Sequence, residues 1–226
     1  MIPNNAKTKL WTQFLEANRV LEDSVPLFES ANGIVQILEY GKNNRKVLKR
    51  SAEMETLMRD LGTTLVREHA EDKVTSSGIL YLMFRKEVGK VVPLYFGKAE
   101  IYGKGDKNLS TNISDLKSGN GKFGRWGYNY AYHVGDLSAV TLPGHPESKI
   151  TRKYSDWRDS LFERNDDGEL IINGDVRFWA CCWNADRQSI WSEYRSTRLA
   201  FEEYLLIGVA SDLFPNDLLN REGRNR

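Results

Sequence analysis

The sequence predicts an α+β fold, in which a small mixed β-sheet with flanking helices follows an N-terminal helical arm. Two observations lead to this prediction. Strand-like apolar runs at residues 78–84 and 93–99 are separated by a charged segment with a glycine, which is the pattern of a β-hairpin. Apolar residues also recur at helical spacing before this hairpin, over residues 51–70, and after it, over residues 196–213.

Length and composition indicate a globular protein. The chain has 226 residues, of which 40% are hydrophobic and 28% charged, enough for one elaborated domain or two small ones. A net charge of +1 means that any nucleic-acid contact must come from a local patch. Neither a secretory signal nor a bilayer-spanning apolar stretch is visible in the sequence, so we expect a cytoplasmic protein without membrane contacts.

The two cysteines, Cys181 and Cys182, are adjacent in a strand-like run. Neighbouring strand residues point to opposite faces, so neither a disulfide nor a shared metal site is expected. We therefore predict two reduced thiols, which agrees with a cytoplasmic protein.

The first 75 residues are expected to form a helical arm or cap on a domain that spans residues 76–226. Helical spacing is found over residues 6–23 and, more strongly, over residues 51–70. Residues 34–40 fit either a strand or a short link into the second helix. If the protein forms an oligomer, we expect these helices to form the contact.

The segment after the hairpin, about residues 99–124, is rich in glycine, asparagine and lysine. This composition predicts a long inserted loop, and loops of that length usually bind a ligand. Lys104, Lys107 and Lys122 are the candidate contacts to a nucleic-acid phosphate chain. The alternative is a merely solvated charged loop.

An aromatic segment then follows, and it contains three polar residues at intervals of four. Arg125, Asn129 and His133 share one face whether the segment is a helix or a strand. Arginine, asparagine and histidine on one face suit phosphate binding and acid–base work better than packing.

The second half predicts a helix over residues 151–164, a hairpin over residues 170–183 with a tight Asn-Gly turn, and a final helix. In the final helix, Glu203 falls within an apolar stripe. A carboxylate there is costly unless it is paired or binds a metal, which makes Glu203 the candidate metal ligand. Alternatively its head lies in water at the rim of the stripe. Glu202 is expected to form a surface pair with Arg198.

Taken in order, these features resemble the GIY-YIG nuclease superfamily, with a layout closest to its restriction-endonuclease-like branch. The first signature reads GILY at residues 78–81, and the second reads YFG at residues 95–97. Arg125 matches the arginine of the family, with His133 as a histidine neighbour at a greater separation than usual.

The C-terminal region resembles the closing pattern of the same family, which is Glu-x-x-Leu-Ile, proline and asparagine. Here this pattern starts at Glu203 and continues with Pro215 and Asn220. The proline and asparagine are more widely separated than usual, which leaves Asn216 as a rival to Asn220. The resemblance implies a GIY-YIG-like domain from about residue 78 to the C-terminus.

The activity implied by the resemblance is metal-dependent hydrolysis of DNA phosphodiester bonds, in one form as a sequence-specific restriction-type endonuclease. Glu203 would hold one divalent cation, Mg²⁺ or Mn²⁺, against the phosphate. Tyr81, helped by Lys98 or His133, would take a proton from the attacking water. Arg125 would stabilise charge on the phosphate in the transition state.

The remaining implied roles are supportive: Tyr95 would orient water or phosphate, and Asn220 would hold the site together. Two other functions stay open. A non-catalytic module of the same fold would bind nucleic acid without cutting it, and its affinity would fall with salt. A structural adaptor would do neither.

Overall fold

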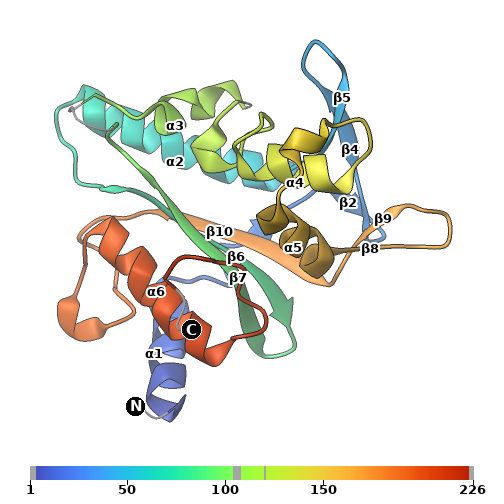
Figure 1. Ribbon diagram of the computed structural model, residues 1–226. Coiled ribbons are helices and arrows are strands. Elements are labelled where there is room, and N and C mark those ends of the chain that lie inside the picture. Colours follow the sequence, from blue (N-terminus) through green and yellow to red (C-terminus); the bar gives the residue numbers. More distant parts are fainter. Residues whose placement is uncertain (1–3, 104–107, 120, 224–226) are drawn as a thin grey trace.

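A four-stranded antiparallel sheet separates two layers of helices in this computed structural model, which describes residues 4–103, 108–119 and 121–223 (Figure 1). The strand order is β1-β10-β6-β7, so β7 lies at an edge. The strands are β1 (Val25–Pro26), β6 (Gly78–Glu87), β7 (Lys90–Glu100) and β10 (Asp175–Cys182).

Figure 1 shows one layer of helices above this sheet and another below it. The upper layer contains α2 (Ala52–Ala70), α3 (Thr111–Ser114), α4 (His133–Thr141) and α5 (Arg152–Leu161). The lower layer contains α1 (Asn4–Ala17) and α6 (Leu199–Leu213). Alternate strand residues point to opposite faces, so the sheet contributes side chains to two separate apolar cores, which we call the upper core and the lower core.

Two smaller antiparallel sheets complete the fold. One has the order β2-β3-β9-β8, and the other pairs β4 with β5 in a hairpin that projects beyond α4 (Figure 1). Their bounds are β2 (Ser30–Ala31), β3 (Ile34–Val35), β4 (Ile37–Tyr40), β5 (Arg45–Leu48), β8 (Phe162–Arg164) and β9 (Leu170–Ile172). Short 3-10 turns lie at η1 (Asp115–Ser118), η2 (Phe123–Arg125), η3 (Glu147–Lys149) and η4 (Ser192–Tyr194).

The α+β class, the β6–β7 hairpin and the long second helix are confirmed. Ser51 caps α2, since its hydroxyl accepts a hydrogen bond from the Met54 backbone N–H at 3.0 Å. The described strand pairings are antiparallel, however, so the expectation of a mixed sheet is wrong.

The predicted hairpin over residues 170–183 is also wrong. β9 pairs with β8 and β3, whereas β10 pairs with β1 and β6, so the Asn-Gly turn leads from one sheet into another. The Asn173 backbone N–H donates to the Leu161 carbonyl at 2.8 Å, which fixes the turn to the end of α5. The hairpin in this region joins β8 to β9 instead.

The N-terminal segment is more than a helical arm. Five short strands lie between its two helices, and β1 extends the central sheet by pairing with β10. Trp11 and Phe14 of α1 are buried in the lower core. Residues 34–40 form two short strands, β3 and β4.

The segment predicted as a long loop, residues 99–124, instead forms α3, η1 and η2 over much of its described length. Ile113, Leu116 and Phe123 pack into the upper core, which explains why the glycine-rich composition misled the loop prediction. Lys104 and Lys107 lie outside the described residues.

The cysteines behave as expected. Cys181 is buried in the lower core and Cys182 in the upper core, and both thiols are free. Within the described ranges, no helix combines the length and the apolar character needed to cross a membrane.

Candidate active site at the edge of the central sheet

Two tyrosines lie side by side on the upper face of the β6–β7 hairpin. Tyr81 comes from β6 and Tyr95 from β7, and their ring centroids are 6.4 Å apart with planes inclined by 29°. Tyr95 lies opposite Met83, which shares a face with Tyr81 because side chains alternate along a strand. Tyr81 is only 2% exposed, whereas Tyr95 is half-buried.

Glycines of the two signatures make this arrangement possible. Gly97 is the partner of Tyr81 across the ladder, and a Cβ at Gly97 would overlap the Tyr81 ring and hydroxyl. Gly78 has φ +143°, and a Cβ there would collide with the Ala99 carbonyl. Both positions therefore need glycine for steric reasons.

Tyr81 is the first member of a buried hydrogen-bonded chain of three side chains. Its hydroxyl lies 3.2 Å from Nε2 of His133, and Nδ1 of His133 lies 2.9 Å from the Tyr154 hydroxyl. A neutral imidazole donates with one nitrogen and accepts with the other, so a proton can move in either direction along this chain. The chain crosses from the sheet through the start of α4 to α5.

Burial keeps all three members of the chain uncharged. It holds the pKa of His133 well below its usual value, with the charges of Lys153 and Arg125 acting in the same direction. Burial likewise raises the pKa of Tyr81 well above its ordinary value and raises that of Tyr154. His133 is therefore a neutral acceptor at physiological pH.

Arg125 and His133 are brought to the same place, but Asn129 is not. The expected single element over residues 125–133 is a turn, and α4 begins only at His133. The Asn129 side chain is exposed, and its Oδ1 accepts a hydrogen bond from Arg45 Nη2 at 3.2 Å. This orientation removes Asn129 from the group around the tyrosines.

Arg125 is exposed and acts electrostatically on both tyrosines. The pKa of Tyr95 is raised to about 12, chiefly by burial and secondly by the Glu203 carboxylate, and the Arg125 guanidinium opposes both. The Glu203 carboxylate likewise raises the pKa of Tyr81, and the Arg125 guanidinium lowers it. We use the name β7-edge site for Tyr81, Tyr95, Arg125, His133 and Glu203, which are linked by a hydrogen bond, ring contacts and electrostatic interactions around Tyr95 of the edge strand.

The segment that carries Arg125 has a strained backbone. Phe123, Gly124 and Arg125 have φ values of 37°, 55° and 81°, all in the left-handed region. Such conformations cost on the order of 1–3 kcal/mol for each non-glycine residue and persist only when the surroundings enforce them.

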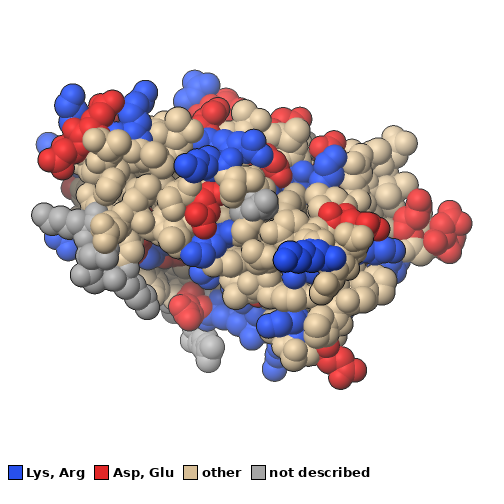
Figure 2. Space-filling view, turned by 90° about the horizontal axis from the view of Figure 1, so that it is seen from above, with Lys and Arg blue, Asp and Glu red and all other residues tan. Residues whose placement is uncertain are grey.

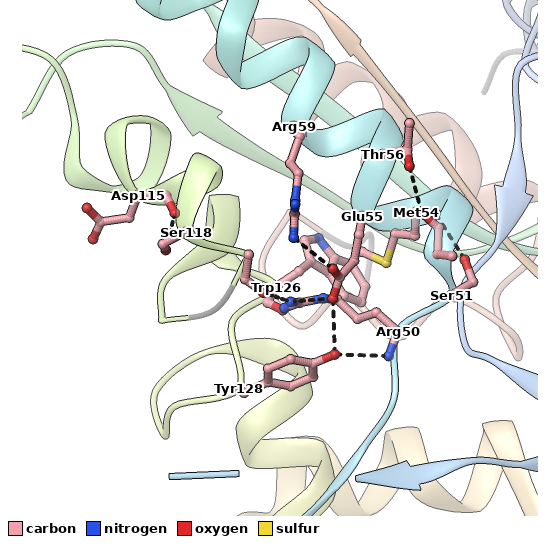
Figure 3. A network of polar contacts seen from close by, with 12 residues as sticks. Arg50, Ser51, Met54, Glu55, Thr56, Arg59, Asp115, Ser118, Trp126 and Tyr128 are labelled. Atoms are coloured by element: carbon pink, nitrogen blue, oxygen red, sulfur yellow. Dashed lines mark hydrogen bonds and ion pairs between the residues drawn. The ribbon is translucent and has the colours of Figure 1, made fainter. Parts of the chain in front are cut away.

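Buried Arg50 supplies this enforcement (Figure 3). It is 1% exposed, and its guanidinium carbon lies 3.8 Å from the Phe123 ring centroid and 3.9 Å from that of Tyr128. Nη1 donates to the Trp126 carbonyl at 2.6 Å, and Nη2 donates to the Gly119 carbonyl. The two carbonyls flank the strained segment, so Arg50 fixes it from both ends.

Glu55 on α2 completes this network. Its Oε1 accepts from Arg50 Nη2 at 3.0 Å and from the Tyr128 hydroxyl at 3.3 Å, while its Oε2 accepts from Arg59 at 3.1 Å (Figure 3). The segment that presents Arg125 is thus bound to α2 through a buried, mostly paired charge. Burial still lowers the pKa of Arg50, against the opposing influence of Tyr128 and Glu55.

The prediction for the two glutamates of α6 was wrong about which one is buried. Glu202, expected at the surface, is 0% exposed; its Oε1 accepts from the Ile190 N–H at 2.8 Å and its Oε2 from the Thr197 hydroxyl at 2.7 Å. Glu203 is half-buried. Glu202 therefore ties the loop before α6 to the helix, and Glu203 is the carboxylate that faces the β7 edge.

Glu203 lies in an excess of negative charge. Burial raises its pKa to about 7; Lys98 opposes this change, and the carboxylates of Glu100 and Glu222 add to it. Lys98 is itself ion-paired with Glu100. A divalent cation would relieve this repulsion, so Glu203 fits a metal ligand of the one-carboxylate kind that Mg²⁺ accepts alongside water and phosphate.

In the part of the chain that the structure describes, no three His, Cys, Asp or Glu side chains are grouped so as to hold a metal ion. Any metal at Glu203 would therefore depend on water and substrate oxygens for its other ligands.

Asn220 binds the exposed edge of β7. Its Oδ1 accepts from the Phe96 N–H and its Nδ2 donates to the Phe96 carbonyl, both at 2.9 Å, so the side chain pairs with the strand as a neighbouring strand would. Leu219 adds a backbone bond to the Leu94 carbonyl at 2.7 Å. Asn216 is exposed. Asn220 thus anchors the C-terminal segment beside the site.

Lys122 does not reach the tyrosines. Its Nζ donates to the Thr111 hydroxyl at 2.5 Å, on the surface above α3.

The sequence analysis missed three residues of this region. Lys153 lies 5.0 Å from the Tyr95 ring centroid, Tyr154 ends the hydrogen-bonded chain, and Glu222 acts on both Tyr95 and Glu203. Burial lowers the pKa of Lys153, and the Arg125 charge adds to this effect. Tyr154 carried a signal, since a tyrosine on the apolar side of a helix needs a partner for its hydroxyl.

Comparisons with protein-family models, curated proteins and solved structures gave no match to this chain. The functional argument therefore rests on the geometry of the β7-edge site.

Proposed function

We propose that the protein is a metal-dependent endonuclease of the GIY-YIG type that hydrolyses DNA phosphodiester bonds. One observation carries the proposal: a neutral Tyr–His–Tyr chain lies beside Tyr95 of the edge strand, and the charges of Arg125 and Glu203 act on both Tyr81 and Tyr95. Hydrolysis of a phosphodiester requires a route for a proton, a cation for the phosphate charge and a metal ligand, and these groups supply each in turn.

The proton route begins at Tyr81. The phenol oxygen accepts a proton from the attacking water while the phenol proton passes to His133 Nε2, so Tyr81 stays neutral and the imidazole becomes charged. Burial disfavours both the phenolate of Tyr81 and the charged imidazole of His133. The imidazole is oriented by Tyr154, which accepts a hydrogen bond from Nδ1–H when Nε2 is the acceptor.

Two cations serve the phosphate. Arg125 is exposed and held in place by its strained segment, so it can donate to the non-bridging oxygens. Lys153 is half-buried beside Tyr95 and within the field of Arg125. Its lowered pKa makes it the better proton donor to the leaving oxygen.

Glu203 would hold the divalent cation, Mg²⁺ or Mn²⁺, which supplies Lewis-acid stabilisation of the phosphate. Tyr95 lies between Lys153 and Tyr81 and would orient water or phosphate. Lys98 limits the repulsion at Glu203, and Asn220 keeps the C-terminal segment against β7.

One observation favours the second candidate, a non-catalytic nucleic-acid-binding module. Tyr81 is 2% exposed, so water must approach its hydroxyl through a narrow opening or after a local movement. A binding module would keep the exposed cations and need no such access.

A plasmid-nicking assay with Mg²⁺ tests the proposal. Arg125→Ala is expected to lower the rate by 100-fold or more, on the order of the loss of one transition-state donor, while leaving the fold intact because the side chain is exposed. Tyr81→Phe should also lose cleavage and retain DNA binding, which separates chemistry from docking. The control is Arg67→Ala, an exposed arginine on α2. Wild-type cleavage by both site variants would refute the assignment, and DNA binding without cleavage by the wild type would favour the binding module.

A further inference from the structure

A second basic feature lies apart from the β7-edge site, in the β4–β5 hairpin. The twelve-residue stretch 37–48 contains three cations, Lys42, Arg45 and Lys46, against the single carboxylate of Glu39. Figure 1 shows this ribbon projecting beyond the body of the protein. Residues 41–44 at its tip are exposed. A two-stranded ribbon of this kind fits the major groove of duplex DNA.

The outer part of the ribbon, from Tyr40 to Lys46, borders a hollow with polar and aromatic walls. Its volume is about 760 Å³, and it is lined by the hairpin on one side and by Tyr130, Pro143, Gly144 and Pro146 on the other. The Arg45 guanidinium carbon lies 4.4 Å from the Tyr130 ring centroid, and the Lys149 Nζ lies 5.2 Å from it. Tyr130 is therefore flanked by two cations.

Arg45 connects this hollow to the β7-edge site. Its Nη2 donates to the Tyr128 carbonyl at 2.8 Å and to Asn129 Oδ1, and both residues lie in the segment that joins Arg125 to His133. His145 fixes the other wall, since its Nε2 lies 2.8 Å from the Lys46 carbonyl and its Nδ1 lies 2.9 Å from the Tyr130 hydroxyl. The hairpin is thus held in a defined position relative to the site.

Further cations lie near the β4–β5 hairpin and near the β7-edge site. Lys149 shares the Tyr130 ring with Arg45, and Lys153 lies beside Tyr95, where the charge of Arg125 acts on it. We use the word row for these four cations, Arg125, Lys153, Lys149 and Arg45. On the face seen in Figure 2, basic and acidic side chains are interspersed and form no single basic surface.

We propose that this row and the β4–β5 hairpin form a docking track for the duplex DNA that flanks the cleavage point, with Lys42 and Lys46 contacting phosphates. The inference rests on the proposed function. It adds a DNA contact remote from the cleaved bond, and explains why a helix-rich N-terminal segment contains a projecting ribbon.

The test measures binding of a 30-base-pair duplex by fluorescence anisotropy in EDTA, over a range of salt concentrations. The variant Lys42→Ala/Lys46→Ala removes two exposed cations, and the control Lys9→Ala/Lys86→Ala removes two exposed cations elsewhere. We expect the hairpin variant to bind about tenfold more weakly and to lower the log–log salt slope by about 1.8, because each lost phosphate contact contributes about 0.9. The control should match the wild type.

Cleavage by the same proteins distinguishes the two proposals. If the wild type cuts and the hairpin variant binds and cuts like the control, the track is refuted and the nuclease stands. If the wild type binds without cutting and the hairpin variant loses affinity, the track stands and the nuclease is refuted. A wild type that neither binds nor cuts duplex DNA refutes both.

Discussion

The two faces of the central sheet bury very different side chains. The lower core, between the sheet and helices α1 and α6, is built from aromatic and aliphatic groups such as Phe14, Trp179 and Leu206. The upper face buries the hydrogen-bonded chain of Tyr81, His133 and Tyr154. The hydrophobic effect explains most of the lower core, where buried Glu202 is a hydrogen-bonded exception, whereas the upper core also contains three linked titratable side chains.

Burying polar, titratable groups carries a free-energy cost that an apolar core avoids. Each hydroxyl or imidazole must be hydrogen-bonded, and a pair of buried hydrogen-bonding groups contributes little net stability compared with apolar groups of the same shape. Under the proposed function, the upper arrangement serves chemistry at the adjoining β7 edge. The predictions below test this division.

The largest expected effect lies on the lower face. Phe14→Ala removes a fully buried ring that packs 6.1 Å from Trp179 and 6.2 Å from Trp11, and should lower the free energy of unfolding by about 3–5 kcal/mol. Urea denaturation measures this loss. Cleavage per folded molecule should stay at the wild-type rate, and a rate that falls in the folded fraction would contradict the division.

Gly97→Ala tests the upper face where the β7 backbone lies against the Tyr81 ring. The added methyl group would overlap the Tyr81 ring, so the ring must move from His133 and cleavage should fall about 100-fold, with about 1–3 kcal/mol lost from overpacking. The matched control is Gly208→Ala in α6, where a Cβ meets nothing within 4 Å. That change should stabilise the protein by about 0.5–1 kcal/mol, as alanine does in a helix, without affecting cleavage.

Tyr154→Phe tests the far end of the hydrogen-bonded chain. Without the Tyr154 hydroxyl, Nδ1 of His133 loses the hydrogen-bond partner that orients the imidazole. We therefore expect about tenfold slower cleavage and about 1 kcal/mol less stability. Tyr204→Phe, at an exposed residue of α6, is the control. Equal cleavage rates for the two variants would exclude Tyr154 from the mechanism.

The smallest effect is a pH dependence of stability at Glu203. Its folded-state pKa of about 7 lies above the usual carboxyl value, so the folded protein holds a proton that the unfolded chain has already lost. Stability from this group is therefore lost as the pH rises from about 4.5 to about 7. Glu203→Gln should raise the Tm at pH 8 and change it little at pH 4.

Magnesium should restore the stability that the wild type loses when Glu203 becomes ionised. A ligand that binds only the folded state raises the Tm, so added Mg²⁺ should stabilise the wild type at pH 8 and leave Glu203→Gln unaffected. Equal shifts in both proteins would mean that the metal binds elsewhere.

Sequence periodicity was sufficient to predict individual helices and strands, but it was insufficient to predict which strands pair with each other. The β6–β7 hairpin and α2 followed from the spacing of apolar residues, but the partners of β9 and β10 depend on tertiary contacts that no local pattern encodes. The glycine-rich segment before Arg125 was misread because Ile113, Leu116 and Phe123 are too sparse to give a periodic signal.

The glutamates of α6 show the same limit within one helix. Leu199 and Leu206 are both buried, and residue 202 or residue 203 can lie between them at a spacing of three or four. Only the contacts of Glu202 with Ile190 and Thr197 decide that Glu202 turns inward. Likewise the role of Arg50 depends on carbonyls far away in the sequence, which spacing cannot reveal.

These two adjacent carboxylates allow the most direct test of the central claim, that chemistry lies at the β7 edge. Plasmid cleavage with Mg²⁺ should be compared between Glu203→Gln and Glu202→Gln. We predict that Glu203→Gln abolishes cleavage without lowering the Tm at pH 8, whereas Glu202→Gln lowers the Tm and retains the wild-type rate per folded molecule. Wild-type cleavage by Glu203→Gln would contradict the account.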